Sequence, residues 1–308
     1  MSGCHGGLVS GEPPRRSGRR RYGAGVRWTV VDAPLDSSGT GRGEQRAPEA
    51  LRRAGLVAAL DADDGGAVDA RVEDAARDPT SGLIGAEAVR RASAAIAARV
   101  AELLAAGQRP LVVGGDCAIL PGVCRALPAG SDLWFVDAHP DFYDGATSET
   151  GEGADMDLSV VTGHGPAVAA GVEGALVDPN RVHLLGHRPA VEEAGRVEAA
   201  RIDPRIRQVP AAELRRDPGL VGAALAEEGS APAWLHLDLD ALDPVDLPAV
   251  TYPEPDGLRR PELVALVAPL TRADRLLGMS VTDLNVDRDL DGRHARRVVE
   301  LLVELLRP

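Results

Sequence analysis

The sequence predicts an α/β fold, a three-layer α/β/α arrangement with a mostly parallel sheet, from three observations. Short apolar and β-branched runs alternate with longer helix-like segments along nearly the whole chain. This alternation is typical of parallel sheets whose two faces are covered by helices. No internal repeat and no Pro/Ser-rich linker follows residue 25. The 308 residues therefore fit one large domain, which we expect to span residues 25–308.

The first part of the chain contains five predicted elements. Residues 28–32 are a β-branched run, which predicts a strand. Residues 48–55 begin at Pro and end at Gly, which predicts a helix. Residues 82–107 are rich in alanine with spaced apolar residues and predict a long helix. The apolar run 111–114 predicts a buried strand, and residues 117–127 predict the helix that follows it.

The rest of the chain continues the same alternation. Apolar runs predict further strands at residues 133–137, 182–186, 234–238 and 276–283. Helices are predicted at residues 157–162, from about residue 189, at 261–270 and at 292–306.

The N-terminal segment, residues 1–24, differs in composition from everything that follows. It is rich in Gly, Ser, Pro and Arg and lacks apolar periodicity. We predict a disordered extension, with a basic interaction arm as the alternative.

The charge of the chain excludes several classes of function. There are 47 acidic and 34 basic residues, and every basic residue is arginine. A chain without lysine cannot use Schiff-base, pyridoxal-phosphate, P-loop or kinase-type lysine chemistry. The net charge of -13 argues against nucleic acid and anionic membranes as partners, and suits a cationic substrate or a divalent metal.

Cysteine content and hydropathy predict a cytoplasmic protein. The three cysteines, Cys4, Cys117 and Cys124, do not form a disulfide framework. No run approaches 18 apolar residues, and no signal-peptide apolar region opens the chain.

Two acid clusters follow predicted strands. Asp137, His139 and Asp141 follow one strand, and Asp238 and Asp240 follow another. Residues i and i+2 of an extended chain point the same way, and ligands bind at the carboxyl ends of strands in open α/β sheets. The alternative is that these acids only cap helices or face solvent. Converging carboxylates repel each other unless protons or metal ions neutralise them, which predicts a pair of divalent ions.

In order and spacing, the motifs of the chain resemble those of the ureohydrolases: arginases, agmatinases, formimidoylglutamases and guanidino-acid hydrolases. The resemblance covers most of the chain. It is carried by a Gly-rich loop at 39–52, Gly-Gly-Asp-Cys at 114–117, Asp-Ala-His-Pro-Asp at 137–141, Asp-Leu-Asp-Ala-Leu-Asp-Pro at 238–244, Pro-Glu-Pro-Asp-Gly-Leu at 253–258 and Thr-Asp-Leu-Asn at 282–285.

The resemblance implies an arginase-like catalytic domain with two divalent metal ions per chain. One ion would bind Cys117, Asp137, Asp141 and Asp238, and the other His139, Asp137, Asp238 and Asp240. Activated water would then attack the carbon of a small guanidino or amidino substrate, with Asp141 steering it. The family commonly forms trimers or hexamers, so a homo-oligomer is expected.

The first departure from the family pattern concerns the metals. Cys117 stands where the family usually has histidine, although it could instead be a small buried residue that starts a helix. Resemblance favours Mn, whereas a thiolate ligand favours Zn, Fe, Co or Ni. A thiolate at a helix N-terminus is also electrostatically favoured.

The second departure concerns the proton shuttle. Counting without gaps from Asp141 places Ala154 where arginases have the shuttle histidine. In that register His164 falls past the following helix and is not the shuttle. Glu152 and Asp155 become the acid–base candidates, with a helix-start role as the alternative for Asp155.

The third departure concerns the substrate pocket. Tyr143 and Tyr252 replace smaller family residues, and Asp283 replaces a guanidinium-binding glutamate. Glu192, at the start of the predicted helix, is placed to meet a substrate amino group. These changes disfavour unmodified arginine and favour an N-hydroxyguanidine or a guanidino acid. A relative that has lost turnover and acts as a binding or regulatory protein is the alternative function.

Overall fold

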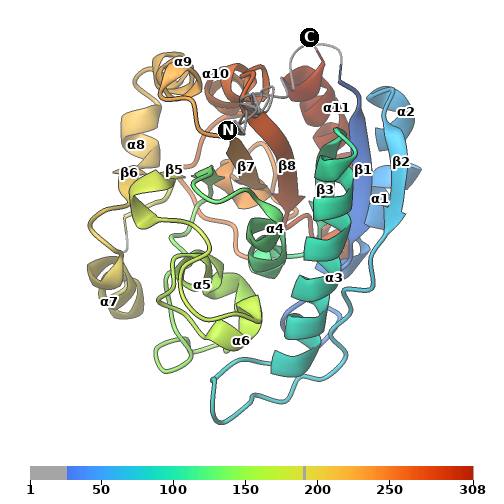
Figure 1. Cartoon of the computed structure of the whole chain (residues 1–308). Coiled ribbons are helices and arrows are strands. Elements are labelled where there is room, and N and C mark those ends of the chain that lie inside the picture. The colour runs from blue at the N-terminus through green and yellow to red at the C-terminus, as the bar shows by residue number, and fades with distance from the viewer. Residues whose placement is uncertain (1–25, 190–191, 308) are drawn as a thin grey trace, which may run out of the picture.

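The computed structural model describes residues 26–189 and 192–307. The predicted N-terminal extension lies outside these described residues. Within them, eight strands form one sheet in the order β2-β1-β3-β8-β7-β4-β5-β6, and all neighbouring strands are parallel (Figure 1). The strands are β1 (Trp28–Ala33), β2 (Asp63–Ala67), β3 (Arg109–Gly114), β4 (Asp132–Val136), β5 (Val182–Leu185), β6 (Arg207–Val209), β7 (Ala233–Asp238) and β8 (Leu276–Thr282).

Helices cover both faces of this sheet. The α-helices are α1 (Ala47–Arg53), α2 (Leu56–Ala59), α3 (Ala86–Ala105), α4 (Leu120–Ala126), α5 (Asp157–Val161), α6 (Ala167–Ala170), α7 (Glu193–Arg201), α8 (Ala211–Leu214), α9 (Pro218–Glu227), α10 (Arg260–Thr271) and α11 (Arg293–Leu306). The 3-10 turns are η1 (Glu44–Arg46), η2 (Cys117–Ile119), η3 (Gly153–Asp155), η4 (Pro179–Arg181), η5 (Leu239–Ala241) and η6 (Val286–Arg288).

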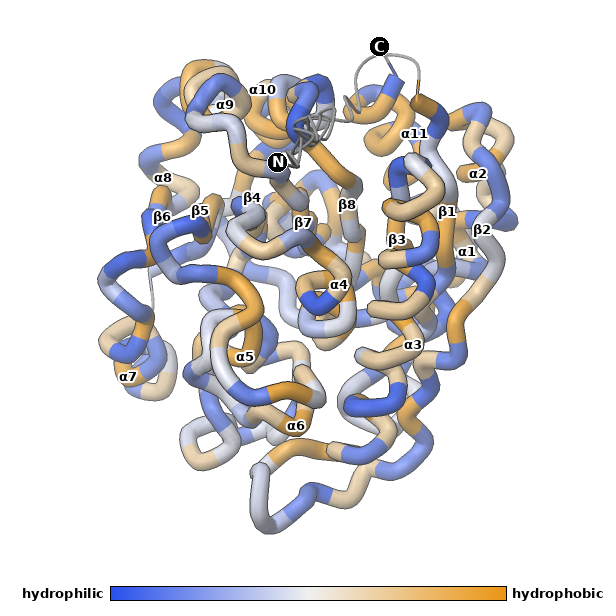
Figure 2. The backbone as a smooth tube through the Cα atoms, viewed as in Figure 1, coloured by the Kyte–Doolittle hydropathy of each residue, from blue (hydrophilic) through white to orange (hydrophobic). Residues whose placement is uncertain are grey.

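Two separate apolar cores make the fold a three-layer sandwich. One core joins strand residues such as Leu235 to side chains of α1, α10 and α11. The other joins residues such as Phe135 to α3, α4, α5 and α6, which lie on the near side of the sheet in Figure 1. Figure 2 shows the hydrophobic strands between the helical layers. The predicted fold class is therefore confirmed.

All six predicted strands and all seven predicted helices are present, with shifted ends. The helix expected from about residue 189 begins only at Glu193, and the one expected at 117–127 opens with the 3-10 turn η2 before α4. The sequence prediction missed β2 and β6, which are the two edges of the sheet. Asp63–Ala67 is acidic and Gly-rich and Arg207–Val209 is short, because an edge strand needs no apolar residues on both faces. The short helices α2, α6 and α8 and the helix α9 were also missed.

No helix in the described ranges is both long and apolar enough to cross a membrane.

Close packing of one glycine holds the site loops at the end of β3. A Cβ atom on Gly115 would lie 1.7 Å from the carbonyl oxygen of Leu35. The carbonyl of Gly115 also accepts the backbone N–H of Asp283 at 2.7 Å. Only glycine permits this approach, which joins the loops after β1, β3 and β8.

We therefore expect Gly115→Ala to destabilise the protein by about 3 kcal/mol or more in urea unfolding, because the backbone must move. Gly219→Ala is the matched control, since its added Cβ meets no atom closer than 3.9 Å and the residue lies in helix α9. The control should be neutral, or stabilising by up to about 1 kcal/mol. Equal stability of both variants would contradict the close approach.

Candidate active site

A pocket of about 540 Å³ opens at the carboxyl ends of the central strands. Every sequence-predicted site residue except Asp137 lines it: Cys117, His139, Asp141, Tyr143, Glu152, Asp155, Glu192, Asp238, Asp240, Tyr252 and Asp283. Asp137 lies just beneath the surface of the pocket and is 1% exposed.

Strand pairing brings the two acid clusters together. Strands β4 and β7 are neighbours with Val136 opposite Leu237, so Asp137 and Asp238 follow side by side. Each carboxylate also accepts a hydrogen bond from the backbone of the loop that follows it. Asp137 accepts the backbone N–H of His139 at 2.6 Å, and Asp238 accepts that of Asp240 at 2.7 Å.

Asp141 and Asp283 face the pocket from a backbone conformation that few residues other than glycine adopt. Their φ angles are 47° and 70°, in the left-handed region that favours glycine. Such strained positions persist only where the surrounding structure enforces them, and they cluster at functional sites.

The clustered carboxylates resist ionisation. Burial, followed by the charges of neighbouring acids, raises the pKa of Asp137 and of Asp141 well above the ordinary value. The same two causes raise the pKa of Asp238 to about 7. Burial also opposes ionisation of Asp240, yet His139, whose Nδ1 lies 2.8 Å from Asp240 Oδ2, holds the pKa of Asp240 below its usual range. The single imidazole of His139 cannot neutralise four carboxylates. Protons or metal ions must neutralise the remaining charge.

Cys117 lies at the centre of the acids. Its thiol is 2.8 Å from Asp238 Oδ2, 3.3 Å from Asp283 Oδ2 and 3.9 Å from Asp137 Oδ2. Burial, and then these carboxylates, raise the pKa of the thiol well above its ordinary value. Without a bound cation, burial and the negative neighbours outweigh the effect of the helix N-terminus and favour the protonated thiol.

Glu152 and Asp155 line the pocket, as the gapless register predicts, and His164 does not. The His164 imidazole instead faces Asp203, with Nε2 3.3 Å from Oδ2. Asp155 accepts hydrogen bonds from the hydroxyls of Ser148 and Thr150 at 2.7 and 2.6 Å. Burial raises the pKa of Asp155 to about 6.

Sequence reasoning assigned no role to Arg42, although it belongs to the quoted Gly-rich loop. Its guanidinium binds Glu152 through two hydrogen bonds, of 2.7 and 2.5 Å. It also donates to the Tyr252 hydroxyl at 3.1 Å. Three glycines of this loop have positive φ, which lets the loop turn back toward the pocket. Glu152 is therefore an ion-paired residue of the pocket.

Glu198 is a second residue that the sequence did not reveal. It lies on α7, faces the pocket and accepts the backbone N–H of Phe142 at 2.8 Å. Burial raises the pKa of Glu198 to about 7. Helix α7 has little amphipathic pattern, so no periodic signal separated Glu198 from its exposed neighbours. Glu254, whose Oε1 lies 3.9 Å from His139 Nε2, belongs to the quoted Pro-Glu-Pro motif.

Comparison with known proteins places the chain in a family. The profile of the Arginase family matches residues 26–307. The chain belongs to the arginase family. It is a hydrolase of this family, acting on linear C–N bonds of guanidino or amidino groups, as the motifs predicted.

Several arginase-family relatives support this assignment. The chain is 27% identical to the arginase of Bacillus caldovelox over 291 residues, covering 90% of this chain and 97% of the relative. The structure of that arginase matches with a TM-score of 0.81 at 26% identity, covering 92% and 99% of the two chains. The N(omega)-hydroxy-L-arginine amidinohydrolase of Streptomyces lavendulae is 28% identical over 207 residues, covering 64% of this chain and 68% of the relative.

The raised pKa values predict how the metal-free protein responds to pH. Asp238 and Glu198 have pKa values of about 7 in the folded state, above those of unfolded carboxyls. The stability that their neutral forms contribute is complete below the unfolded pKa and is lost as pH rises through 7. Buried His187 and His236, with pKa values of about 4 and 3, act oppositely only below about pH 6.5, where unfolded histidine becomes charged.

We therefore expect chelator-treated protein to lose about 1 kcal/mol in total as pH rises from about 6.5 to 8.5, with little further loss from these groups at higher pH. Thermal denaturation at several pH values measures this loss. Adding a divalent metal at the upper pH should restore the denaturation midpoint. A midpoint that is constant or rising with pH in metal-free protein would contradict the electrostatics described for the cluster.

Proposed function

We propose that the chain hydrolyses a cationic guanidino or amidino compound other than unmodified arginine, with two divalent metal ions bound in the carboxylate cluster. The observation that carries the proposal is the convergence of Asp137, Asp141, Asp238 and Asp240 in one buried site. Acids this close and this buried need cations to be ionised at neutral pH.

The donor atoms fit such a metal pair. Ligand atoms of Cys117, Asp137 and Asp238 lie within 4.8 Å of one another, as do those of Asp137, His139 and Asp141. The two groups share Asp137, as a bridging carboxylate requires. By resemblance to the family, Cys117, Asp137, Asp141 and Asp238 would hold one ion, and His139, Asp137, Asp238 and Asp240 the other; the donor atoms of Asp141 group with those of His139 rather than with Cys117. Bound divalent ions supply a lowered pKa for water and positive charge to balance the acids.

The remaining pocket residues would bind and orient the substrate. The Asp283 carboxylate lines the pocket beside the cluster and would pair with a guanidinium, whose planar fork matches a carboxylate. Glu192 and Tyr143 also line the pocket and would contact the rest of a cationic molecule. Arg42 holds Glu152 and Tyr252 together, which narrows the pocket relative to one with small residues there.

Asp155 is the residue best suited to protonate the leaving amine. Its pKa of about 6 keeps a fraction of the carboxyl protonated near neutral pH, and the two hydroxyls fix its orientation. Glu152 is held by Arg42 and would act mainly in positioning. Asp141, as one of the four carboxylates of the cluster, would also orient the attacking water.

Metal identity and substrate depend on the departures from the family pattern. A thiol among the ligands favours Zn, Fe, Co or Ni over the Mn expected from resemblance. The similarity to an N(omega)-hydroxy-L-arginine amidinohydrolase supports an N-hydroxyguanidine as substrate. A homo-oligomer, trimer or hexamer, and a cytoplasmic location stay predictions.

The second candidate function is a binding or regulatory relative without turnover. The observation that favours it is Ala154, which lines the pocket and carries no proton donor.

We expect metal-loaded protein to release N-hydroxyurea from N-hydroxy-arginine with a kcat/KM at least tenfold above that for the release of urea from arginine. A panel of guanidino and amidino compounds, assayed with Mn, Zn, Co and Fe in turn, measures this. Asp238→Asn serves as the inactive control. Release of no product from any compound would favour the binding protein, and a preference for arginine would overturn the substrate proposal.

Asp155→Asn should lower kcat by about 10²- to 10⁴-fold, the range for losing a general acid. It should also remove an ionisation near pH 6 from the pH profile of kcat. His164→Ala should be nearly silent, because that imidazole faces Asp203 outside the pocket. The reverse pattern would show that His164 is the proton donor.

A further inference from the structure

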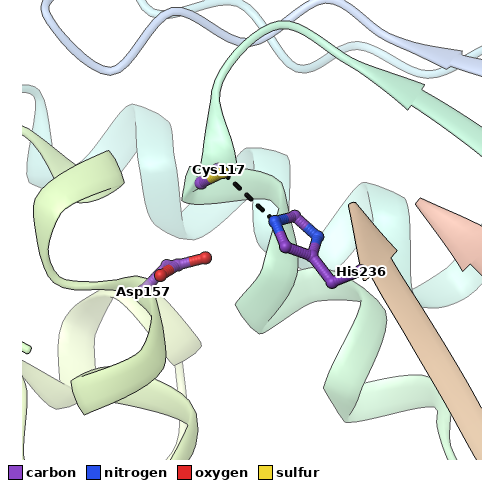
Figure 3. A group of neighbouring side chains, drawn as sticks. All are labelled: Cys117, Asp157 and His236. Carbon is purple, nitrogen blue, oxygen red and sulfur yellow. Dashed lines mark hydrogen bonds between the residues drawn. The ribbon is translucent and has the colours of Figure 1, made fainter. Parts of the chain in front are cut away.

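A second group of metal-ligating side chains lies behind Cys117, away from the pocket. Cys117, Asp157 and His236 converge from η2, α5 and β7 (Figure 3). Their ligand atoms all lie within 4.8 Å of one another, and Cys117 Sγ is 3.1 Å from His236 Nε2. Asp157 and His236 are fully buried and do not line the pocket.

Hydrogen bonds within the chain do not account for Asp157. Neither of its carboxylate oxygens has a hydrogen-bond partner of ordinary geometry. Burial raises the pKa of Asp157 well above its usual value. Contacts with the backbone N–H of Leu158 and with the Asp141 carboxyl group lower this pKa, but neither contact has the geometry of an ordinary hydrogen bond. A fully buried carboxylate without partners is costly, so it must hold a proton or face a cation.

A different acid cluster in the same protein shows the contrast. Ligand atoms of Asp36, Glu44 and Asp116 also lie within 4.8 Å of one another. Asp116, however, accepts the backbone N–H groups of Ser37 and Ala118 at 2.5 and 3.1 Å. Asp36 and Glu44 are likewise bonded, so that cluster needs no ion.

The surroundings of His236 suit a metal ligand. Its Nδ1 lies 2.8 Å from the Ser280 hydroxyl oxygen, and Trp234 Nε1 donates to the same oxygen at 3.0 Å. Ring stacking on Phe135, with centroids 5.1 Å apart, fixes the imidazole plane. When Nδ1–H donates to Ser280, the lone pair of Nε2 points toward Cys117 and Asp157. A partner on the far nitrogen is usual for metal-bound histidine.

We infer that Cys117, Asp157 and His236 form a site for one thiophilic divalent ion, Zn²⁺, Fe²⁺ or Co²⁺, directly behind the carboxylate cluster. Sulfur, nitrogen and oxygen donors together favour these ions over Mn²⁺ or Mg²⁺. Asp238 Oδ2 lies 2.8 Å from Cys117 Sγ, so Asp238 would supply a fourth ligand. Binding displaces the thiol proton to solvent.

This inference deepens the proposed function and rests on it for the presence of metal beside Cys117. It changes which residues hold the ion beside Cys117: His236 from β7 and Asp157 from α5 join Cys117 and Asp238, in place of Asp137 and Asp141. The sulfur and imidazole also restrict the choice of metal at that position.

Cobalt(II) loading of the purified full-length protein tests the site, because thiolate ligation gives a sulfur-to-cobalt charge-transfer band. We expect this band in the wild type and its loss in Cys117→Ser. His236→Gln and Asp157→Asn should each weaken the Co²⁺ affinity, measured by titrating that band, by more than about 100-fold. Loss of a residue that only supports a metal ligand costs up to about 100-fold in affinity. Cys124→Ser is the matched control and should keep the band, since Cys124 belongs to none of the metal-ligating groups among the described residues.

X-ray absorption of the zinc-loaded wild type tests the site without any variant, so a variant that fails to fold does not affect it. One sulfur at about 2.3 Å from zinc is expected. A zinc shell without sulfur, or a cobalt band of unchanged affinity in both His236→Gln and Asp157→Asn, would overturn the inference. Turnover of the guanidino panel is read separately. Turnover without a sulfur band overturns only this site, whereas a band lost in the variants without any turnover supports the site and overturns the proposed function.

Discussion

The structure depends on one constraint: several carboxylates share a small buried volume where parallel strands end. The register of β4 and β7 makes this unavoidable, because Asp137 and Asp238 follow directly opposite positions. The nearby arginines do not neutralise these carboxylates. Arg188 donates its guanidinium hydrogens to the backbone carbonyls of Gly186, Asp240, Leu242 and Glu254. Arg42 pairs with Glu152 at the edge of the pocket. The cluster therefore keeps an unbalanced negative charge that protons or metal ions must meet.

The rest of the fold holds this arrangement in place. Apolar cores pack against both faces of the sheet, so the strand ends cannot move apart to relieve the repulsion between the carboxylates. Arg188 ties the loops that follow β5 and β7 to each other. Gly115 admits the Leu35 carbonyl and accepts the N–H of Asp283, which joins three further loops. Such a scaffold would preorganise the ligands of the proposed metal ions before the ions bind.

Sequence reasoning predicted the fold and most of the pocket for a physical reason. Interior strands are apolar on both faces and end abruptly at charged residues, so β4 and β7 were visible together with Asp137, His139, Asp238 and Asp240. Edge strands and short helices carry no such pattern and were missed. Arg42 and Glu198 reach the pocket through loop and helix packing, which spacing along the chain does not encode.

The pairing of Cys117 with His236 and Asp157 was invisible for a related reason. His236 lies within a strand whose apolar neighbours predict a core position, and Asp157 looked like an ordinary helix start. Only the parallel register of β7 and β8 and the packing of α5 bring them to the cysteine. Cys117, which the sequence did reveal as a departure from the family pattern, thus lies against a histidine and an acid whose proximity the sequence did not reveal.

The central claim is that divalent ions balance the buried carboxylates. Anomalous diffraction from crystals grown with Mn²⁺ or Co²⁺ tests it most directly, because it locates each ion among the side chains. Anomalous peaks are expected between Asp137 and Asp238, with both carboxylates as shared ligands. Crystals of metal-loaded protein with no peak there, and with Asp137 and Asp238 directly hydrogen-bonded through a shared proton, would contradict it.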